Sequence, residues 1–133
     1  MYKERLSARE RLILNTICGA DHPLITRDII GKNEKLSQST VQLVVRELSD
    51  RGLIKESGVK HSGNVLAREY IATEKASEEV LLYVVEEYQQ IRNVISITEY
   101  IMALIEAEKD DNRRKQLVEE VRELIQELKS KET

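Results

Sequence analysis

The stretch SQSTVQLVVRELSDRGLI, residues 37–54, decides the fold that this sequence predicts. Ser37 is a favourable N-cap and Gly52 a favourable terminator, so we expect a helix from Ser37 to about Arg51. Aliphatic side chains recur along it at the spacing of one helix face: Val41, Val44, Val45 and Leu48. The other face carries small hydroxyls, an amide, one leucine and one arginine: Ser39, Thr40, Gln42, Leu43 and Arg46. A solvated surface usually carries Glu and Lys instead, so this face predicts a binding function.

Two helices are predicted upstream of this stretch. Ser7 and Glu10 match a capping box, and a helix beginning there should end near Gly19. Apolar residues in that segment have helical spacing: Leu12, Ile13, Ile17 and Ala20. Pro23 then excludes a continuing helix, and residues 24–25 fit a very short strand. A brief second helix is expected from a Thr26 cap through Ile30, with Gly31 as its terminator.

After Gly52 the sequence pattern changes to short β-prone segments. Residues 53–57 (LIKES) and 65–73 (VLAREYIAT) predict two strands, and the glycine-bearing residues 58–64 (GVKHSGN) predict the loop between them. The expected order is helix, short strand, helix, helix and hairpin. This is the order of a winged helix-turn-helix, so we expect a mainly α fold with a small β-hairpin wing, over residues 1–72.

Residues 73–133 are helical in pattern and predict a separate dimerisation domain. A single helix over residues 77–109 would be about 48 Å long, so a break is expected around residues 93–96. Between Val80 and Leu128 there are 22 large apolar side chains, more than two or three helices can bury among themselves. A second copy of the chain is the simplest cover for them. The residues expected at this homodimer interface are Leu81, Val84, Val85, Tyr88, Ile91, Ile101, Met102, Ile105, Leu117, Val121, Leu124 and Leu128.

The two halves of the chain also differ in charge. Residues 1–72 hold 12 lysines and arginines against 9 acidic residues, whereas residues 73–133 hold 9 against 15. The net charge of −3 is therefore unevenly spread, and the basic half is the candidate for binding an anion. The lone cysteine, the charged N-terminal segment and the lack of an 18-residue apolar run lead us to expect a cytoplasmic protein with no membrane partner.

The outward face of the 37–51 helix has the chemistry of a base-reading surface. Gln42 suits paired hydrogen bonds to adenine, Arg46 to guanine, and Leu43 contact with thymine methyls. Ser39 and Thr40 suit bases or phosphates, and the free amides of the helix start at Ser37 suit a phosphate. Double-stranded DNA is the partner that this face predicts. An ordinary surface helix is the competing interpretation; the position just before a hairpin favours DNA recognition.

Outside that helix, few residues indicate a site. Lys60 and His61, in the expected hairpin loop, suit backbone phosphates or the minor groove, although His61 taken alone fits a solvated loop residue. His22 fits a turn residue beside Pro23, and Cys18 a small core side chain. One cysteine and two histidines without ligand spacing are a poor set, so we expect no metal. The absence of a glycine-rich phosphate loop and of a catalytic constellation leads us to expect no cofactor and no enzymatic activity.

Residues 7–72 followed by a helical tail resemble the penicillinase-repressor (BlaI/MecI/CopY) family. The resemblance rests on RERLILNTI, on PLITRDII, and on SQSTVQLVVRELSDRGLI, which is similar to the family pattern S-x-x-T-[IV]-x-x-x-[LV]-x-x-L-x-x-[KR]-G. It implies a homodimeric, bacterial-type transcriptional repressor on a palindromic operator, with DNA contacts at Ser39, Thr40 and Leu43. The chain departs from the family in its longer wing and in having no tryptophan near the first helix and no cysteine after Cys18, so copper sensing is not expected.

Two alternatives to a repressor remain open from the sequence. One is a winged-helix adaptor that presents the same face to a protein partner. The other is a ligand-responsive regulator of the phenolic-acid (PadR) or multidrug-resistance (MarR) type. The sequence carries no recognisable protease cleavage motif in residues 93–110, and the inducing signal, whether ligand or sensor protease, cannot be read from it.

Overall fold

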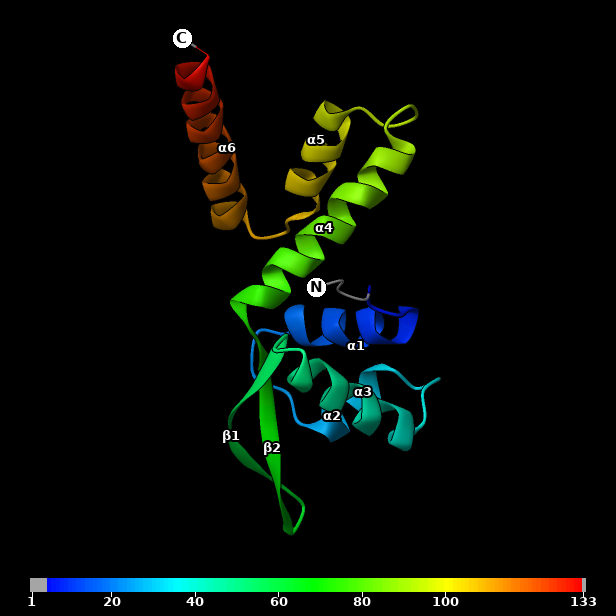
Figure 1. The fold of residues 1–133 in the computed structure, drawn as a ribbon. Helices are drawn as coiled ribbons and strands as arrows, with labels where there is room; N and C mark the ends of the chain where they lie inside the picture. The colour runs from blue at the N-terminus through cyan, green and yellow to red at the C-terminus, as the bar shows by residue number, and fades with distance from the viewer. Residues whose placement is uncertain (1–4, 133) are drawn as a thin grey trace. The chain divides into compact units, whose positions relative to one another are not determined.

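The computed structural model describes residues 5–132, which form six helices and one antiparallel hairpin (Figure 1). The elements in chain order are α1 (Ala8–Cys18), α2 (Thr26–Lys32), α3 (Gln38–Asp50), β1 (Ile54–Ser62), β2 (Val65–Ala72), α4 (Glu74–Ile91), α5 (Ile97–Ala107) and α6 (Asp111–Lys131). The predicted order of helices and hairpin is therefore confirmed. The chain divides into two compact units, Met1–Val85 and Glu86–Thr133.

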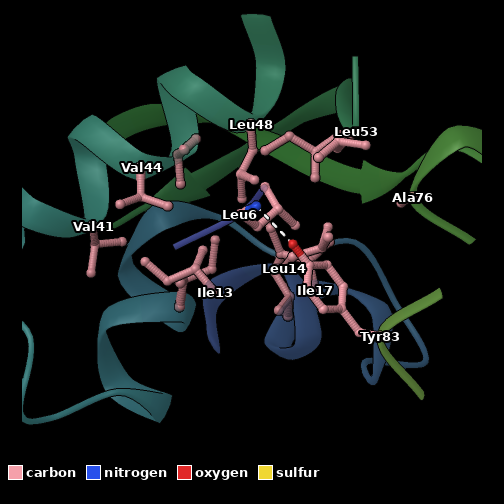
Figure 2. Packing of buried hydrophobic residues seen from close by; sticks show 14 residues of the cluster. Leu6, Ile13, Leu14, Ile17, Val41, Val44, Leu48, Leu53, Ala76 and Tyr83 are labelled. Atoms are coloured by element: carbon pink, nitrogen blue, oxygen red, sulfur yellow. Dashed lines mark hydrogen bonds between the residues drawn. The ribbon is translucent and has the colours of Figure 1, made fainter. Parts of the chain in front are cut away.

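A single aliphatic core holds the first unit together (Figure 2). The helices α1 and α3 supply half of its buried side chains: Ile13, Leu14, Ile17, Val41, Val44, Val45 and Leu48. Leu24, Ile29 and Leu53 are fully buried beside them. All four aliphatic positions predicted for the inner face of α3 are buried, so the amphipathic pattern of that helix is confirmed.

The ends of α1 and α3 are fixed by the predicted serine caps. Ser7 and Glu10 form the full capping box at α1, and the Ser37 hydroxyl accepts the amide of Thr40 at α3. Glu10 also lies 3.6 Å from the Arg51 guanidinium, at the far end of α3, and both side chains are largely buried. The start of α1 and the end of α3 are thus joined by one carboxylate.

Tyr83 on α4 belongs to the core of the first unit, which extends beyond the predicted boundary after residue 72. Its hydroxyl accepts the backbone N–H of Leu6 at 2.7 Å (Figure 2). The Arg11 guanidinium lies 4.2 Å from the centre of its ring, within the range of a cation–π contact. Ala76, one turn into α4, is fully buried as well. The assignment of residues 1–72 to a DNA-binding domain and of residues 73–133 to a dimerisation domain stays a prediction.

Several expectations for α1 and α2 are wrong. Leu12 is 48% exposed and Leu14 takes the buried position, because the core touches a narrower stripe of α1 than the apolar pattern covers. Cys18 is exposed at the helix end and is not a core side chain. Thr26 is the first residue of α2 and not its cap; the backbone of Ile25 instead donates to the Asp28 carboxylate.

The end of α2 also differs from the prediction. Gly31 lies inside α2, and the helix continues to Lys32. The buried residue Asn33 ends it: its side-chain amide donates to the carbonyl of Ile29 and to the hydroxyl of Thr16 on α1. The helix therefore ends where a side-chain amide bonds to both α1 and α2, and not at the glycine that the local sequence predicted.

The hairpin is longer, and its turn shorter, than predicted. Residues 58–62 continue β1, so only Gly63 and Asn64 form the turn. Gly63 adopts φ +65°, which a two-residue hairpin turn requires and glycine adopts without strain. At its foot the hairpin is extended by the predicted short strand, in which Leu24 pairs with Tyr70. The hairpin projects from the three-helix core as a wing (Figure 1).

The second unit contains the end of α4 followed by α5 and α6. The helix break expected at residues 93–96 is confirmed, since α4 ends at Ile91 and Ser96 caps α5. Within this unit the Tyr88 hydroxyl donates to the carbonyl of Ile95, and its ring meets Tyr100 edge-on at 5.5 Å. Neither α5 nor α6 has a buried residue, so their apolar side chains lack a core within the described chain.

Across residues 5–132, none of the helices combines the length and the apolar content needed to cross a membrane.

Two leucines on opposite faces of α3 provide a matched test of this packing. Leu48 is fully buried and Leu43 is 52% exposed. We expect Leu48→Ala to lower the free energy of unfolding by about 2–5 kcal/mol, because it leaves a cavity in the core. Leu43→Ala should change it by about 0.5 kcal/mol or less. Urea denaturation of both variants measures the difference, and equal losses would show that the helix faces are wrongly assigned.

Candidate nucleic-acid interface

The outward face of α3 is free of contacts with the core. Ser39, Gln42, Leu43 and Arg46 are exposed, and Thr40 is half-buried. The predicted exposure of Leu43 is confirmed, at 52%. Within residues 5–132 Arg46 forms no ion pair, and it is the only cation on α3. The face therefore presents hydrogen-bonding groups, one aliphatic side chain and one unpaired guanidinium in a single stripe.

Three hydroxyls gather at the start of α3. The Ser37 hydroxyl donates to the Thr40 hydroxyl at 2.9 Å and lies 3.2 Å from the hydroxyl of Ser39. Because Ser37 also accepts the backbone amide of Thr40, its orientation is fixed by the cap. The Ser37 hydroxyl therefore already makes hydrogen bonds within the helix, whereas the Ser39 side chain is exposed on the surface.

A hollow of about 410 Å³ lies beside this stripe, between α3, the start of α2 and the hairpin stem. Its lining residues are Thr26, Gln42, Val45, Arg46, Ser49, Asp50, Glu56, Arg68 and Tyr70. Sequence reasoning identified Gln42 and Arg46 but missed Thr26, Arg68 and Tyr70, which lie on other elements. The pairing of the two strands brings Arg68 here, and no local sequence pattern marks it.

The wing places Lys60 and His61 on opposite faces. Side chains alternate along a strand, and cross-strand partners share a face. His61 pairs with Leu66, which shares the face of Arg68 and Tyr70 that meets the hollow. Lys60 pairs with Ala67 and faces the other way. The structure therefore brings His61 to the α3 side of the wing and does not bring Lys60 there.

Arg68 is held at the edge of the hollow by an acidic neighbour. Its guanidinium lies 3.1 Å from the Glu56 carboxylate across the hairpin, and both side chains are more than half exposed. Ser57, between Glu56 and Gly58, is an extra residue that shifts the strand register. Arg46 and Arg68 thus line one hollow, together with the carboxylates of Asp50 and Glu56.

The remaining candidates lie apart from α3. His22 contacts the neighbouring Asp21 carboxylate at 2.7 Å, and this hydrogen bond lowers the pKa of Asp21. Partial burial raises the pKa of the Cys18 thiol above its ordinary value, which disfavours the reactive thiolate. Among the described residues, no group of three or more His, Cys, Asp or Glu side chains is placed to hold a metal.

Comparison of the sequence with models of known protein families and with curated proteins finds no match. Solved structures are similar in fold. The PcaV transcriptional regulator from Streptomyces coelicolor, solved with its natural ligand, shares 20% identity over 78% of this chain and 73% of its own, with a TM-score of 0.51. The ZitR protein of Lactococcus lactis, solved with DNA, shares 18% identity over 96% of this chain and 78% of its own, with a TM-score of 0.48. A MarR family regulator from Neisseria meningitidis shares 18% identity over 96% and 82%, with a TM-score of 0.47.

The fold is a winged helix-turn-helix. The similarity to PcaV agrees with the element order and with the projecting hairpin. The neighbours named above include a MarR family member, and the resemblance to the penicillinase-repressor family is not confirmed by them. In this fold α2 and α3 form the helix-turn-helix and the β1–β2 hairpin is the wing, so the stripe on α3 occupies the position of a recognition helix.

Proposed function

We propose that this chain is a homodimeric DNA-binding transcriptional regulator, a repressor that binds a palindromic operator with α3 in the major groove. The observation that supports it most is the free outward face of α3, next to a wing that carries cations. A recognition helix needs a face that its own core leaves unused. The similarity to PcaV, itself a transcriptional regulator, supports the same function.

The chemistry of the α3 stripe suits base edges. Gln42 would pair with adenine, Arg46 with guanine, and Leu43 would contact a thymine methyl group. Ser39, with Thr40 and Ser37 at the helix start, would bind phosphates or bases. On the wing, His61 faces the same side as α3, so it is the better placed of the two predicted wing contacts. Lys60 faces the other way and would reach DNA only at the backbone of the adjacent groove.

Dimerisation would cover the apolar side chains that α4, α5 and α6 leave exposed. Leu81, Met102 and Leu128 are each more than half exposed. Ile101, Ile105, Leu117 and Val121 are half-buried, and none of the twelve predicted interface residues is buried within the described chain. Monomeric proteins rarely leave so many large apolar side chains open to water. A twofold dimer would present two α3 helices, which is why a palindromic operator is proposed.

Selection of bound sequences from random duplex DNA tests this function. We expect an inverted repeat whose half-sites are about one helical turn apart, bound by the full chain. Binding should weaken steeply between 50 and 200 mM salt, because phosphate contacts release counterions. An adaptor that used α3 for a protein partner would enrich no sequence. Failure to enrich any duplex would exclude the proposed function.

Arg46 should supply specificity at one base pair of each half-site. If its guanidinium pairs with a guanine, Arg46→Ala should cost roughly 1–3 kcal/mol of binding free energy and relax the preference at that position alone. Binding measured on the selected operator and on its single-base variants gives both values. A uniform loss across all variants would place Arg46 on a phosphate, and no loss would place it outside the interface.

Leu81 and Leu66 are a matched pair for testing the dimer. They are 62% and 61% exposed, on α4 and at the wing respectively. Leu81→Glu should shift the chain from dimer to monomer, because a charge would be buried at the interface. Leu66→Glu should leave the dimer intact. Sedimentation equilibrium at micromolar concentration reads out the mass. A monomeric wild type would contradict the homodimer.

A further inference from the structure

The hollow between α3 and the wing lies where a DNA backbone strand has to pass. A helix in the major groove and a wing in the adjacent minor groove lie on either side of the sugar-phosphate strand that separates those grooves. In this chain the space between the two elements is the hollow of about 410 Å³. The passage of a DNA strand through this hollow rests on the proposed function. It would bring residues on the wing and at the start of α2 into the interface.

Cationic and neutral donors line the hollow from three elements. The two residues with guanidinium groups are Arg46 on α3 and Arg68 on β2, and Thr26 and Tyr70, whose side chains carry hydroxyls, line the same hollow. Arg68 shares its hairpin face with Tyr70, because the two are separated by one residue on β2. Guanidinium groups bind phosphates in two-point hydrogen bonds, so this set suits a backbone phosphate.

Two carboxylates oppose that binding. Asp50 and Glu56 also line the hollow, and Glu56 holds the Arg68 guanidinium at 3.1 Å. Both partners are more than half exposed, so the ion pair contributes little to the stability of the fold and can exchange one acceptor for another. A phosphate entering the hollow would compete with Glu56 for the same guanidinium.

We propose that Arg68 binds the backbone phosphate that crosses this hollow, and that Glu56 competes for its guanidinium and thereby limits the affinity for DNA. A phosphate contact carries no base information, so Arg68 raises affinity on every sequence alike. Glu56 then sets how much of that affinity is realised. Removing its charge frees Arg68 and strengthens binding.

The test uses the full chain and a duplex selected from random DNA with the wild type. Arg68→Gln should bind about tenfold more weakly, with a salt slope smaller by about one and an unchanged base preference. Lys55→Gln is the matched control, since it removes one positive charge from the opposite face of the same hairpin, where Lys55 pairs with Ile71. It should change binding by less than about threefold. Melting temperatures should match the wild type in both variants.

Glu56→Gln gives the opposite result, tighter binding by roughly threefold. In the double variant Glu56→Gln with Arg68→Gln that gain should disappear, because Glu56 acts on Arg68. A gain that persists there overturns the competition. Equal affinity and equal salt slope for Arg68→Gln and Lys55→Gln overturn the phosphate contact while leaving the proposed function standing. If the wild type binds no duplex, the proposed function and this inference fall together.

Discussion

The burial of one face of α3 is the constraint on which the other features depend. Val41 and Leu48 are fully buried, two turns apart on the same stripe, and they fix the rotation of the helix about its axis. Once that rotation is fixed, Gln42, Leu43 and Arg46 must point outward. The outward stripe is therefore a consequence of core packing and does not rest on contacts of its own. Changes on that face can alter binding with little effect on folding.

The register of the hairpin is a second constraint, and one residue decides it. Ser57 has no partner on β2, so the alternation of side chains along β1 changes phase at that point. Glu56 before the extra residue and His61 after it consequently lie on the same face, together with Arg68. If Ser57 paired regularly with Glu69, Lys60 would pair with Leu66 and take the place of His61 on the α3 side. The bulge at Ser57 thus decides which of these two side chains faces α3.

Local patterns predicted several helix boundaries and the buried face of α3, because caps and periodicity act over short distances. The cap at Ser37, the buried stripe of α3 and the break before Ser96 follow from residues within one or two turns. The predicted stop at Gly31 is wrong because Asn33 ends α2 through bonds to α2 and to α1. Likewise, the loop at residues 58–64 is mostly strand, because cross-strand pairing continues through positions whose glycines suggest a turn.

Contacts between distant residues could not be predicted in the same way. Tyr83 meets Leu6 across 77 positions in sequence, and its spacing on α4 is that of any apolar helical residue. Arg68 reaches the hollow only through strand pairing, so the exposed stripe on α3 was predicted from sequence and the position of Arg68 beside it was not. The sequence of α4 to α6 contains more large apolar side chains than these helices can bury among themselves, but it does not show which surface covers them. The described chain leaves that surface exposed, and its cover remains a proposal.

The charges around α3 bear on how such a regulator would find its operator. Arg46 and Arg68 are balanced in the hollow by Asp50 and Glu56, and the chain as a whole carries a formal charge of −3. Non-specific attraction to DNA depends on unbalanced positive charge, so it should be weak for this surface. Under the proposed function, each copy makes only a limited set of contacts, and affinity must then come from making that set twice, once by each half of a dimer. The apolar helices that join two copies would matter for operator binding as much as the residues that touch DNA.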